Sequence, residues 1–233
     1  MLNGTDVPAA PGFPPSATTQ LLGGPSTMPW MNGYLTPLAS VPSTALYVIA
    51  IGGNDVRDLS VAVATGITSP FAVPGLAANY ATAVGNMVDA LQAKGAQRIV
   101  VWNTPNVGAT PAALAGPLGF AGLATDISTF FNGALATRMS TEAPGVSIFN
   151  VFGTTNQIIA TPGAYGLSHV TDACGFAGNN CDPATALFWD GIHPTSAGHA
   201  ILAAGMLAAV PEPSSMLMLA VGICALLAWR RRA

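Results

Sequence analysis

The feature that most constrains the fold is an apolar run, Ala45 to Ile51, which is closed by Gly52-Gly53-Asn54-Asp55. An uninterrupted apolar run of this length, ended by glycines, is typical of a strand buried on both faces of a parallel sheet. Two further runs, 98–102 and 146–152, predict a second and a third strand. A loop is expected between the Gly-Gly-Asn-Asp motif and the helix that follows it.

Helical patterns alternate with these strands and cover residues 76–94, 123–142 and 196–209. This alternation predicts an α/β fold with a parallel sheet. In such a sheet the reactive loops lie at the carboxyl ends of the strands, and Asn54 and Asn103 both fall at such ends. The stretch after residue 152 is expected to be a long loop.

The charge content excludes one large class of function. The chain has 7 Lys and Arg against 10 Asp and Glu, and three of the cations stand together near the C-terminus. So few cations cannot build a basic face, so nucleic acid is excluded as a partner. Because 51% of the residues are apolar, disorder over most of the chain is also excluded.

The chain divides into three segments. Residues 1–44 are rich in proline and predict an irregular, extended stretch, residues 45–209 form the folded domain, and residues 210–233 form a separate tail. No Lys or Arg lies near Met1 and no apolar segment comes after it, so we expect no secretory signal peptide here.

The tail contains an apolar run, residues 216–229, that predicts a C-terminal helix in the inner membrane. The run is short against the ~20 residues that a span needs, but Trp229 and the arginines 230–232 suit a membrane interface. The arginines place that end in the cytoplasm and the domain on the other side. The alternative is a buried terminal helix, which the adjacent arginines disfavour.

Histidine is the natural acid–base group at neutral pH, and the chain has three: His169, His193 and His199. Asp190 precedes His193 by three residues, so its carboxylate can accept a hydrogen bond from Nδ1 and leave Nε2 free as a base. Equally, Asp190 could cap the following helix and His193 could be a surface residue of the turn. We interpret His199 as structural and His169 as a loop residue.

Asn54 is a candidate for stabilising negative charge. The glycines before it let the backbone approach a ligand closely, and its amide can donate a hydrogen bond to a developing oxyanion. On its own the motif is also compatible with an ordinary turn.

Taken together, these motifs resemble the SGNH or GDSL-type esterase–lipase family, and most closely its secreted phospholipase/lecithinase branch. The resemblance covers about residues 45–209. It rests on Ala45–Asp55, on Gly95–Val101, on Leu187–Thr195 and on the Val170–Cys174 stretch with a second cysteine after it. It implies a flavodoxin-like α/β/α sandwich, with Asn54 as oxyanion-hole donor, Asp190 orienting the base, and His193 as general base. It implies no metal or organic cofactor.

The tail resembles a PEP-CTERM sorting signal, with Val210-Pro211-Glu212-Pro213, the apolar run and the terminal arginines. Such a signal implies export in a Gram-negative bacterium, transient membrane anchoring, processing by an exosortase-type enzyme, and a final place at the cell surface or outside the cell.

The family's Gly-Asp-Ser-Leu block, which supplies the nucleophile, does not occur here. Gly23, Gly24 and the serines 16, 26, 40 and 43 lack the required context, so the nucleophile is unknown. We interpret the chain as lacking the first strand of the family fold. The 45–51 strand would then form an unpaired edge, which is an aggregation hazard. Little hydrolysis of p-nitrophenyl acetate or butyrate is expected from residues 1–233.

The three cysteines predict one disulfide. Cys174 and Cys181 lie in a Gly/Asn-rich loop without a histidine at zinc-ligand spacing, so a bridge is favoured over a metal site. Cys224, inside the apolar tail, is interpreted as a small apolar residue.

The leading hypothesis is an exported ester hydrolase acting on a lipid, a short acyl ester or an acylated polysaccharide. The alternative is a non-catalytic surface protein displayed through its tail. An acyltransferase using the same site has the same sequence signature.

Overall fold

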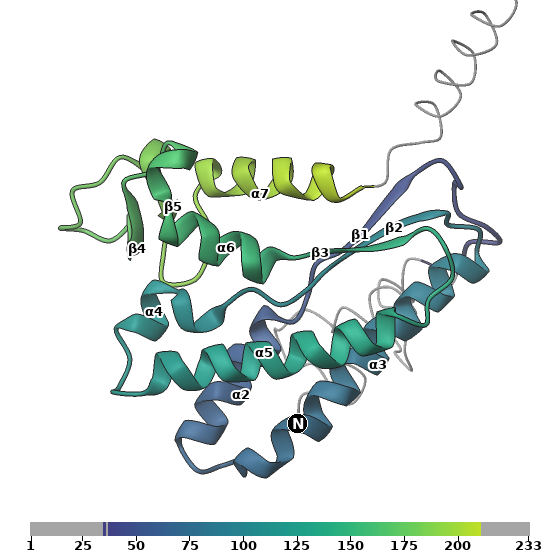
Figure 1. Ribbon diagram of the computed structural model, residues 1–233, viewed down its shortest axis with the longest axis horizontal. Coiled ribbons are helices and arrows are strands. Elements are labelled where there is room, and N and C mark those ends of the chain that lie inside the picture. Colours follow the sequence, from purple (N-terminus) through teal and green to yellow (C-terminus); the bar gives the residue numbers. More distant parts are fainter. Residues whose placement is uncertain (1–34, 36, 211–233) are drawn as a thin grey trace, which may run out of the picture.

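The computed structural model describes residue 35 and residues 37–210 (Figure 1). At its centre is a three-stranded sheet in the order β1-β2-β3, and all its strands are parallel. The strands are β1 (Leu46–Ile49), β2 (Arg98–Trp102) and β3 (Val146–Phe149). Their carboxyl ends therefore meet at one end of the sheet. The predicted α/β class with a parallel sheet is confirmed.

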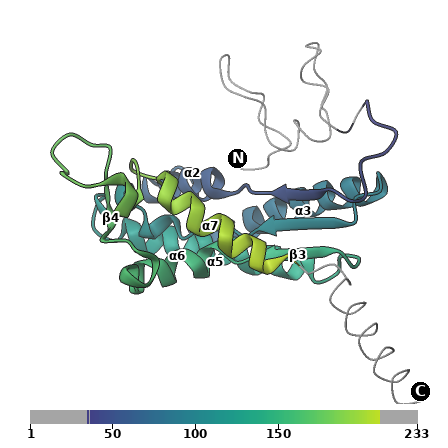
Figure 2. The same cartoon turned by 90° about the horizontal axis from the view of Figure 1, so that it is seen from above.

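Helices cover both faces of this sheet. Helices α2 (Gly53–Ala64), α3 (Val73–Ala93) and α5 (Phe120–Met139) lie on one face, and α6 (Val151–Ala160) and α7 (Ser196–Ala209) lie on the other (Figure 1). The view from above shows α7 running along the sheet toward β3, with β4 and the loop after it at the opposite end (Figure 2).

Alternation along β2 creates two separate cores. Ile99 and Val101 pack with α2, α3 and α5 in the larger core. Val100, between them in sequence, belongs to the smaller core, which contains Phe149 of β3 and Leu202 of α7. All three β2 side chains are almost completely buried. The predicted strand 98–102 is confirmed, and it is buried on both faces.

A second, two-stranded sheet lies beside α7. It pairs β4 (His169–Ala173) with β5 (Ala186–Phe188) in parallel. Shorter elements complete the described part: the short helix α4 (Pro111–Leu114) and the 3-10 turns η2 (Pro70–Ala72), η3 (Val107–Ala109), η4 (Pro162–Tyr165) and η5 (Pro183–Thr185).

The prediction that the first strand is buried on both faces is wrong. Leu46 and Val48 are 36% and 44% exposed, whereas Ile49 is 6% exposed. Among the described residues β1 pairs with β2 alone, so it lies at an edge of the sheet, where one face is incompletely covered. The edge position agrees with the sequence prediction, but the burial does not.

Three local assignments also need correction. Residues 53–64 form helix α2 and not a loop, because Val56, Leu59 and Ser60 recur on one buried face. The third strand ends at Phe149 and not at residue 152, because the Asn150 side chain accepts a hydrogen bond from the Gly153 N–H and starts α6. The expected long loop contains α6, β4 and β5, and His169 begins β4.

None of the helices in residues 37–210 is long and apolar enough to cross a membrane. The predicted membrane helix 216–229 lies outside the described residues, as does most of the proline-rich stretch. The division at residues 44/45 and 209/210 remains a prediction.

Candidate active site

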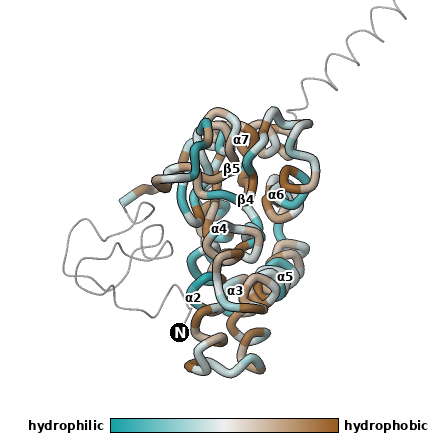
Figure 3. Tube along the Cα trace, turned by 90° about the vertical axis from the view of Figure 1, so that its left-hand side faces the viewer, coloured by the Kyte–Doolittle hydropathy of each residue, from teal (hydrophilic) through white to brown (hydrophobic). Residues whose placement is uncertain are grey.

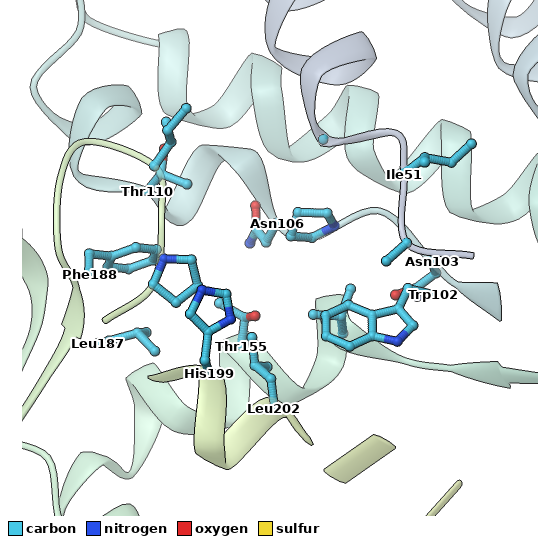
Figure 4. Close-up of a pocket in the computed structure, with 16 residues that line it drawn as sticks. Ile51, Trp102, Asn103, Asn106, Thr110, Thr155, Leu187, Phe188, His199 and Leu202 are labelled. Carbon is cyan, nitrogen blue, oxygen red and sulfur yellow. The ribbon is translucent and has the colours of Figure 1, made fainter. Parts of the chain in front are cut away.

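A cavity of about 370 Å³ opens at the carboxyl ends of the strands (Figure 4). Ile51 and Gly53 line it from the end of β1, Trp102 and Asn103 line it from the end of β2, and the smaller core closes its floor. Ile192 and Pro194, the two neighbours of His193, line the same cavity. The loops that the sequence places at the strand ends therefore border one shared space.

The turn between β5 and α7 brings Asp190 and His193 together. Asp190 Oδ2 lies 2.8 Å from Nδ1 of His193. The other carboxylate oxygen, Oδ1, accepts hydrogen bonds from the backbone N–H groups of Ile192 at 2.8 Å and His193 at 2.7 Å. The Trp189 N–H donates to the His193 carbonyl at 2.8 Å and closes the turn. The Asp190 carboxylate thus holds both the backbone of this turn and the His193 imidazole in position.

The alternative in which Asp190 caps the last helix is wrong. The N-cap of α7 is Thr195, whose hydroxyl accepts a hydrogen bond from the Gly198 N–H at 3.0 Å. The same hydroxyl donates to the Ala186 carbonyl at 2.5 Å and is buried. Thr195 caps the helix, and the Asp190 carboxylate makes its hydrogen bonds to the backbone of the turn and to the His193 imidazole.

Asp190 is ionised at neutral pH. Burial raises the pKa of its carboxyl, but the hydrogen bonds from the His193 ring and from the backbone N–H groups of His193 and Ile192 outweigh that effect and lower the pKa to about 2. In a neutral imidazole, a carboxylate beside Nδ1 favours the tautomer with the proton on Nδ1 and the lone pair on Nε2. The His193 side chain is 69% exposed, so Nε2 is accessible.

Two other segments hold this turn from outside. On one side, the Ala112 N–H at the start of α4 donates to the Gly191 carbonyl at 2.9 Å. On the other side, the Gly175 N–H donates to the Trp189 carbonyl at 2.6 Å. A Cβ on Gly175 would lie 2.7 Å from the Trp189 indole, so only glycine fits this contact. The turn is therefore clamped between α4 and the loop after β4.

The loop after β4 is closed by the predicted disulfide between Cys174 and Cys181, whose Cα atoms are 5.5 Å apart. Cys174 is buried, and its N–H donates to the Phe188 carbonyl at 3.0 Å. The bridge thus fixes the loop whose Gly175 contacts Trp189. Among the described residues, no group of three or more His, Cys, Asp or Glu is placed to hold a metal ion.

Asn54 lies in the first turn of α2, and its side chain is exposed. The helix can start here because Gly52 takes a left-handed conformation with φ of 105°. A Cβ on Gly52 would lie 2.6 Å from the Thr104 methyl and 2.7 Å from the Tyr80 hydroxyl, so no larger residue fits. Gly53, the neighbour of Asn54, and Ile192 and Pro194, the neighbours of His193, line the cavity, whereas Asn54 and His193 are not among its lining residues.

Tyr80 supports this strand end from α3. Its hydroxyl donates to the Ile51 carbonyl at 3.3 Å. Burial, followed by the nearby charge of Asp55, raises the Tyr80 pKa well above its usual value, so the hydroxyl remains a donor at any physiological pH.

Two asparagines in the cavity wall were not assigned from the sequence as supports of the site. The Asn103 amide donates to Asn150 Oδ1 at 2.8 Å, and its oxygen accepts from the Phe152 N–H at 3.1 Å. Asn106 donates to Asn156 Oδ1 at 2.8 Å and accepts from the Thr125 hydroxyl at the same distance. These contacts join segments far apart in sequence, so both side chains hold the walls in place.

His199 lines the cavity, and its ring points into it from α7 (Figure 4). Leu202, three residues further along the helix, lines the cavity as well. The three-residue spacing places His199 and Leu202 on one face of the helix, and this was the sequence signal that could have placed His199 beside the cavity. His169 lies outside the cavity and pairs more loosely with Asp172, at 3.5 Å.

The nucleophile remains unassigned. Among the described residues, no Ser or Thr hydroxyl makes a hydrogen bond to the His193 ring. Thr110 lines the cavity, but its hydroxyl donates to the Val107 carbonyl at 2.7 Å. Ser40 and Ser43 precede β1 and so lie toward the opposite end of the sheet, whereas Ser16, Ser26, Gly23 and Gly24 lie outside the described residues.

Proteins similar in sequence to this chain include two esterases. An esterase, EstA, of Pseudomonas aeruginosa and one of the same name in Pseudomonas putida are each 32% identical to the chain over 123 residues, which is 46% of this chain and 19% of the relative. An uncharacterized protein of the trpE-trpG intergenic region in Pseudomonas putida is 27% identical over 191 residues, which is 73% of this chain and 29% of that protein. The chain thus matches less than a third of each relative's length.

Two family patterns match the chain. The PEP-CTERM protein-sorting motif matches residues 209–232, which confirms the predicted sorting signal. The pattern of the GDSL-like lipases and acylhydrolases matches residues 18–206, which includes the whole of the described domain up to the third turn of α7. The chain therefore belongs to the GDSL-like lipase/acylhydrolase family.

Proposed function

We propose that this domain hydrolyses acyl esters, with His193 as general base. A hydroxyl nucleophile gives its proton to Nε2 of His193 as its oxygen attacks the ester carbonyl. Asp190 holds the imidazole in the required tautomer and stabilises the imidazolium that forms. Asn54, at the positive end of α2, faces the developing oxyanion. The proton on Nε2 then passes to the leaving alcohol. A water that gives its proton to the same nitrogen attacks the acyl-enzyme carbonyl, and the acid leaves as the proton returns to the nucleophile oxygen.

The observation that carries this proposal is the 2.8 Å contact between Asp190 and Nδ1 of His193, in a turn whose residues Ile192 and Pro194 line the same cavity as Gly53. The largely apolar wall of that cavity, with Ile51, Trp102 and Leu202, suits an acyl group. Family membership supports the same chemistry.

The sorting motif supports an exported protein. We propose that an exosortase-type enzyme processes the tail and that residues 216–229 anchor the protein in the inner membrane until then. The domain would end at the cell surface or outside the cell, where the Cys174–Cys181 bridge is stable.

The test is hydrolysis of p-nitrophenyl butyrate by two preparations. One is residues 1–233, and the other is the protein expressed from its native gene with whatever residues the frame encodes before Met1. We expect turnover from the native-gene product, and we expect this turnover to disappear in His193→Ala. If neither preparation hydrolyses the ester, the hydrolase proposal fails and the alternative of a non-catalytic surface protein is supported. Turnover that survives His193→Ala removes this residue from the mechanism.

One specific observation favours that alternative: no hydroxyl among the described residues is hydrogen-bonded to His193. In that case the same domain would be displayed on the surface through its sorting tail. Trapping of a covalent fluorophosphonate adduct by the native-gene product would contradict it, because that reagent reacts with an activated serine.

A further inference from the structure

The cavity contains polar side chains that the proposed hydrolysis does not use. Three of them are held by the protein itself: Asn103 and Asn106 form hydrogen bonds across the wall, and the Thr110 hydroxyl donates to a backbone carbonyl. Thr155 of α6 and His199 of α7 line the same cavity. Within the described part of the chain, the side chains of these two residues make no hydrogen bond.

The Thr155 hydroxyl differs from that of four other helical threonines. Thr82, Thr129, Thr137 and Thr154 each donate to the carbonyl four residues earlier at 2.9 Å, which satisfies a hydroxyl inside a helix. Thr155 makes no such bond, although it is only 7% exposed, and its side chain points into the cavity (Figure 4). Because buried polar groups are normally paired, this hydroxyl is available to a ligand.

His199 reaches the cavity on the same side as Thr155. Helices α6 and α7 lie side by side (Figures 1 and 3), and Ile158 of α6 packs with Leu202 of α7 in the smaller core. Thr155 and His199 each precede one of these contact residues by three positions, on the same helix face. His199 is exposed and Thr155 is buried, so the imidazole lies at the mouth of the cavity and the hydroxyl lies in its wall.

The rest of the wall restricts what these two side chains can bind. Among the described residues, no Lys, Arg, Asp or Glu lines the cavity, so a charged ligand group would find no fixed charge of opposite sign. The indole Nε1 of Trp102 has no hydrogen-bond partner either, but surrounding atoms cover it, so a ligand in the cavity does not reach it. The cavity therefore suits an apolar ligand that carries one neutral polar group.

We propose that Thr155 and His199 form a subsite for a hydroxyl group on the acyl chain of the substrate. A threonine hydroxyl and a neutral imidazole each offer a donor and an acceptor. A hydroxyl on the ligand both donates and accepts at one oxygen atom, so it can pair with both side chains, whereas a carbonyl can only accept. An unsubstituted chain leaves the Thr155 hydroxyl unpaired and should bind less tightly. This inference rests on the proposed function, to which it adds a preference for hydroxylated acyl esters.

The preference can be measured by binding, without turnover. Residues 1–233 carrying His193→Ala, so that no ester is consumed through this base, are titrated with methyl hexanoate and with its 2-, 3- and 6-hydroxy derivatives. Dissociation constants are read from the ¹H–¹⁵N NMR shifts of Ile192 and Leu202, which line the cavity. We expect at least one hydroxy ester to bind about 5-fold more tightly than methyl hexanoate.

Thr155→Val removes the hydroxyl and keeps the branched shape, and it should abolish the preference. His199→Phe, which keeps a ring without nitrogen, should reduce it. Thr154→Val is the matched control, because this adjacent hydroxyl donates to the Asn150 carbonyl at 2.9 Å, and the preference should remain. The urea midpoint of Thr155→Val should not fall, because no hydrogen bond is lost.

Equal binding of all four esters, or binding of none, overturns the proposal. A preference that survives Thr155→Val, or that is lost equally in Thr154→Val, overturns it as well, because the hydroxyl is then not recognised by Thr155. A lower urea midpoint in Thr155→Val would show that the hydroxyl has a partner in the folded protein, with the same consequence.

Hydrolysis of p-nitrophenyl butyrate by the native-gene product separates this inference from the proposed function. Turnover without a preference for a hydroxy ester retains the hydrolase and rejects the subsite. A preference without turnover retains the subsite and rejects the hydrolase.

Discussion

The two faces of the sheet are held together by different forces. On the face of α3 and α5, side chains such as Val84, Phe131 and Leu135 have no exposed surface and form one continuous apolar core. On the opposite face, the turn from Trp189 to His193 depends on hydrogen bonds, and Asp190 and His193 remain 36% and 69% exposed. The larger core therefore contributes most to stability, whereas the exposed side chains of this turn can change with little effect on the fold.

The largest expected effect tests the exposed face. In the catalytically active protein, His193→Ala removes the general base and should lower kcat/KM for p-nitrophenyl butyrate by about 10⁴-fold or more. The melting temperature should hardly change, because the side chain is 69% exposed.

His169→Ala is the matched control for this variant. His169 also has an aspartate three residues away, at 3.5 Å, but its sequence neighbours do not line the cavity, whereas both neighbours of His193 do. Its loss should leave the rate unchanged, and an equal loss of rate in both variants would argue against a specific role for His193.

The next largest effect tests the buried face. Phe131→Ala leaves a cavity where the ring packs against Tyr80, with ring centroids 5.0 Å apart. The free energy of unfolding should fall by about 3–5 kcal/mol, measured by urea denaturation. Phe130→Ala, one residue earlier and 53% exposed, should cost far less. Similar losses for both would contradict the division into a buried and an exposed face.

The sequence allowed prediction where local pattern decides the structure. Strand 98–102 and helix 196–209 have the predicted bounds, because one is a continuous apolar run and the other begins after a Thr cap and ends before Pro211. Helix α2 was missed because Gly52 and Gly53 are typical of a turn. Strand β4 was missed because only Ala173 among its residues is buried.

In the candidate site, too, the sequence predicted the contact between residues close in sequence and missed the contacts between distant segments. The contact of Asp190 with His193 follows from their spacing. The contacts of Gly175 and Ala112 with the same turn join segments distant in sequence, and no local pattern carries them.

A smaller effect is expected from the disulfide loop that contacts the turn from Trp189 to His193. Cys174→Ser opens the loop that holds Gly175 against Trp189 and should lower the free energy of unfolding by about 2–3 kcal/mol. Thiol labelling of the exported protein without reductant should miss Cys174 and Cys181. If both react, the bridge is absent in the exported protein.

The smallest effect is a pH dependence. The pKa of Asp190 is lowered to about 2 in the folded protein, against about 3.9 in the unfolded chain. Its contribution to stability is thus fully present above about pH 4 and is lost as the pH falls toward 2. Asp190→Asn should flatten the stability curve in that window, as seen in urea midpoints. If Asp190→Asn leaves the shape of the curve unchanged, the hydrogen bonds to the Asp190 carboxylate do not contribute to the free energy of unfolding.

The most direct test of the account is the tautomer of His193, read from ¹⁵N NMR of the imidazole at neutral pH. We predict a proton on Nδ1, held by Asp190, and an unprotonated Nε2, and we predict that Asp190→Asn disturbs this preference. A proton on Nε2 with Nδ1 unprotonated in the unaltered protein would contradict the assignment of His193 as the base.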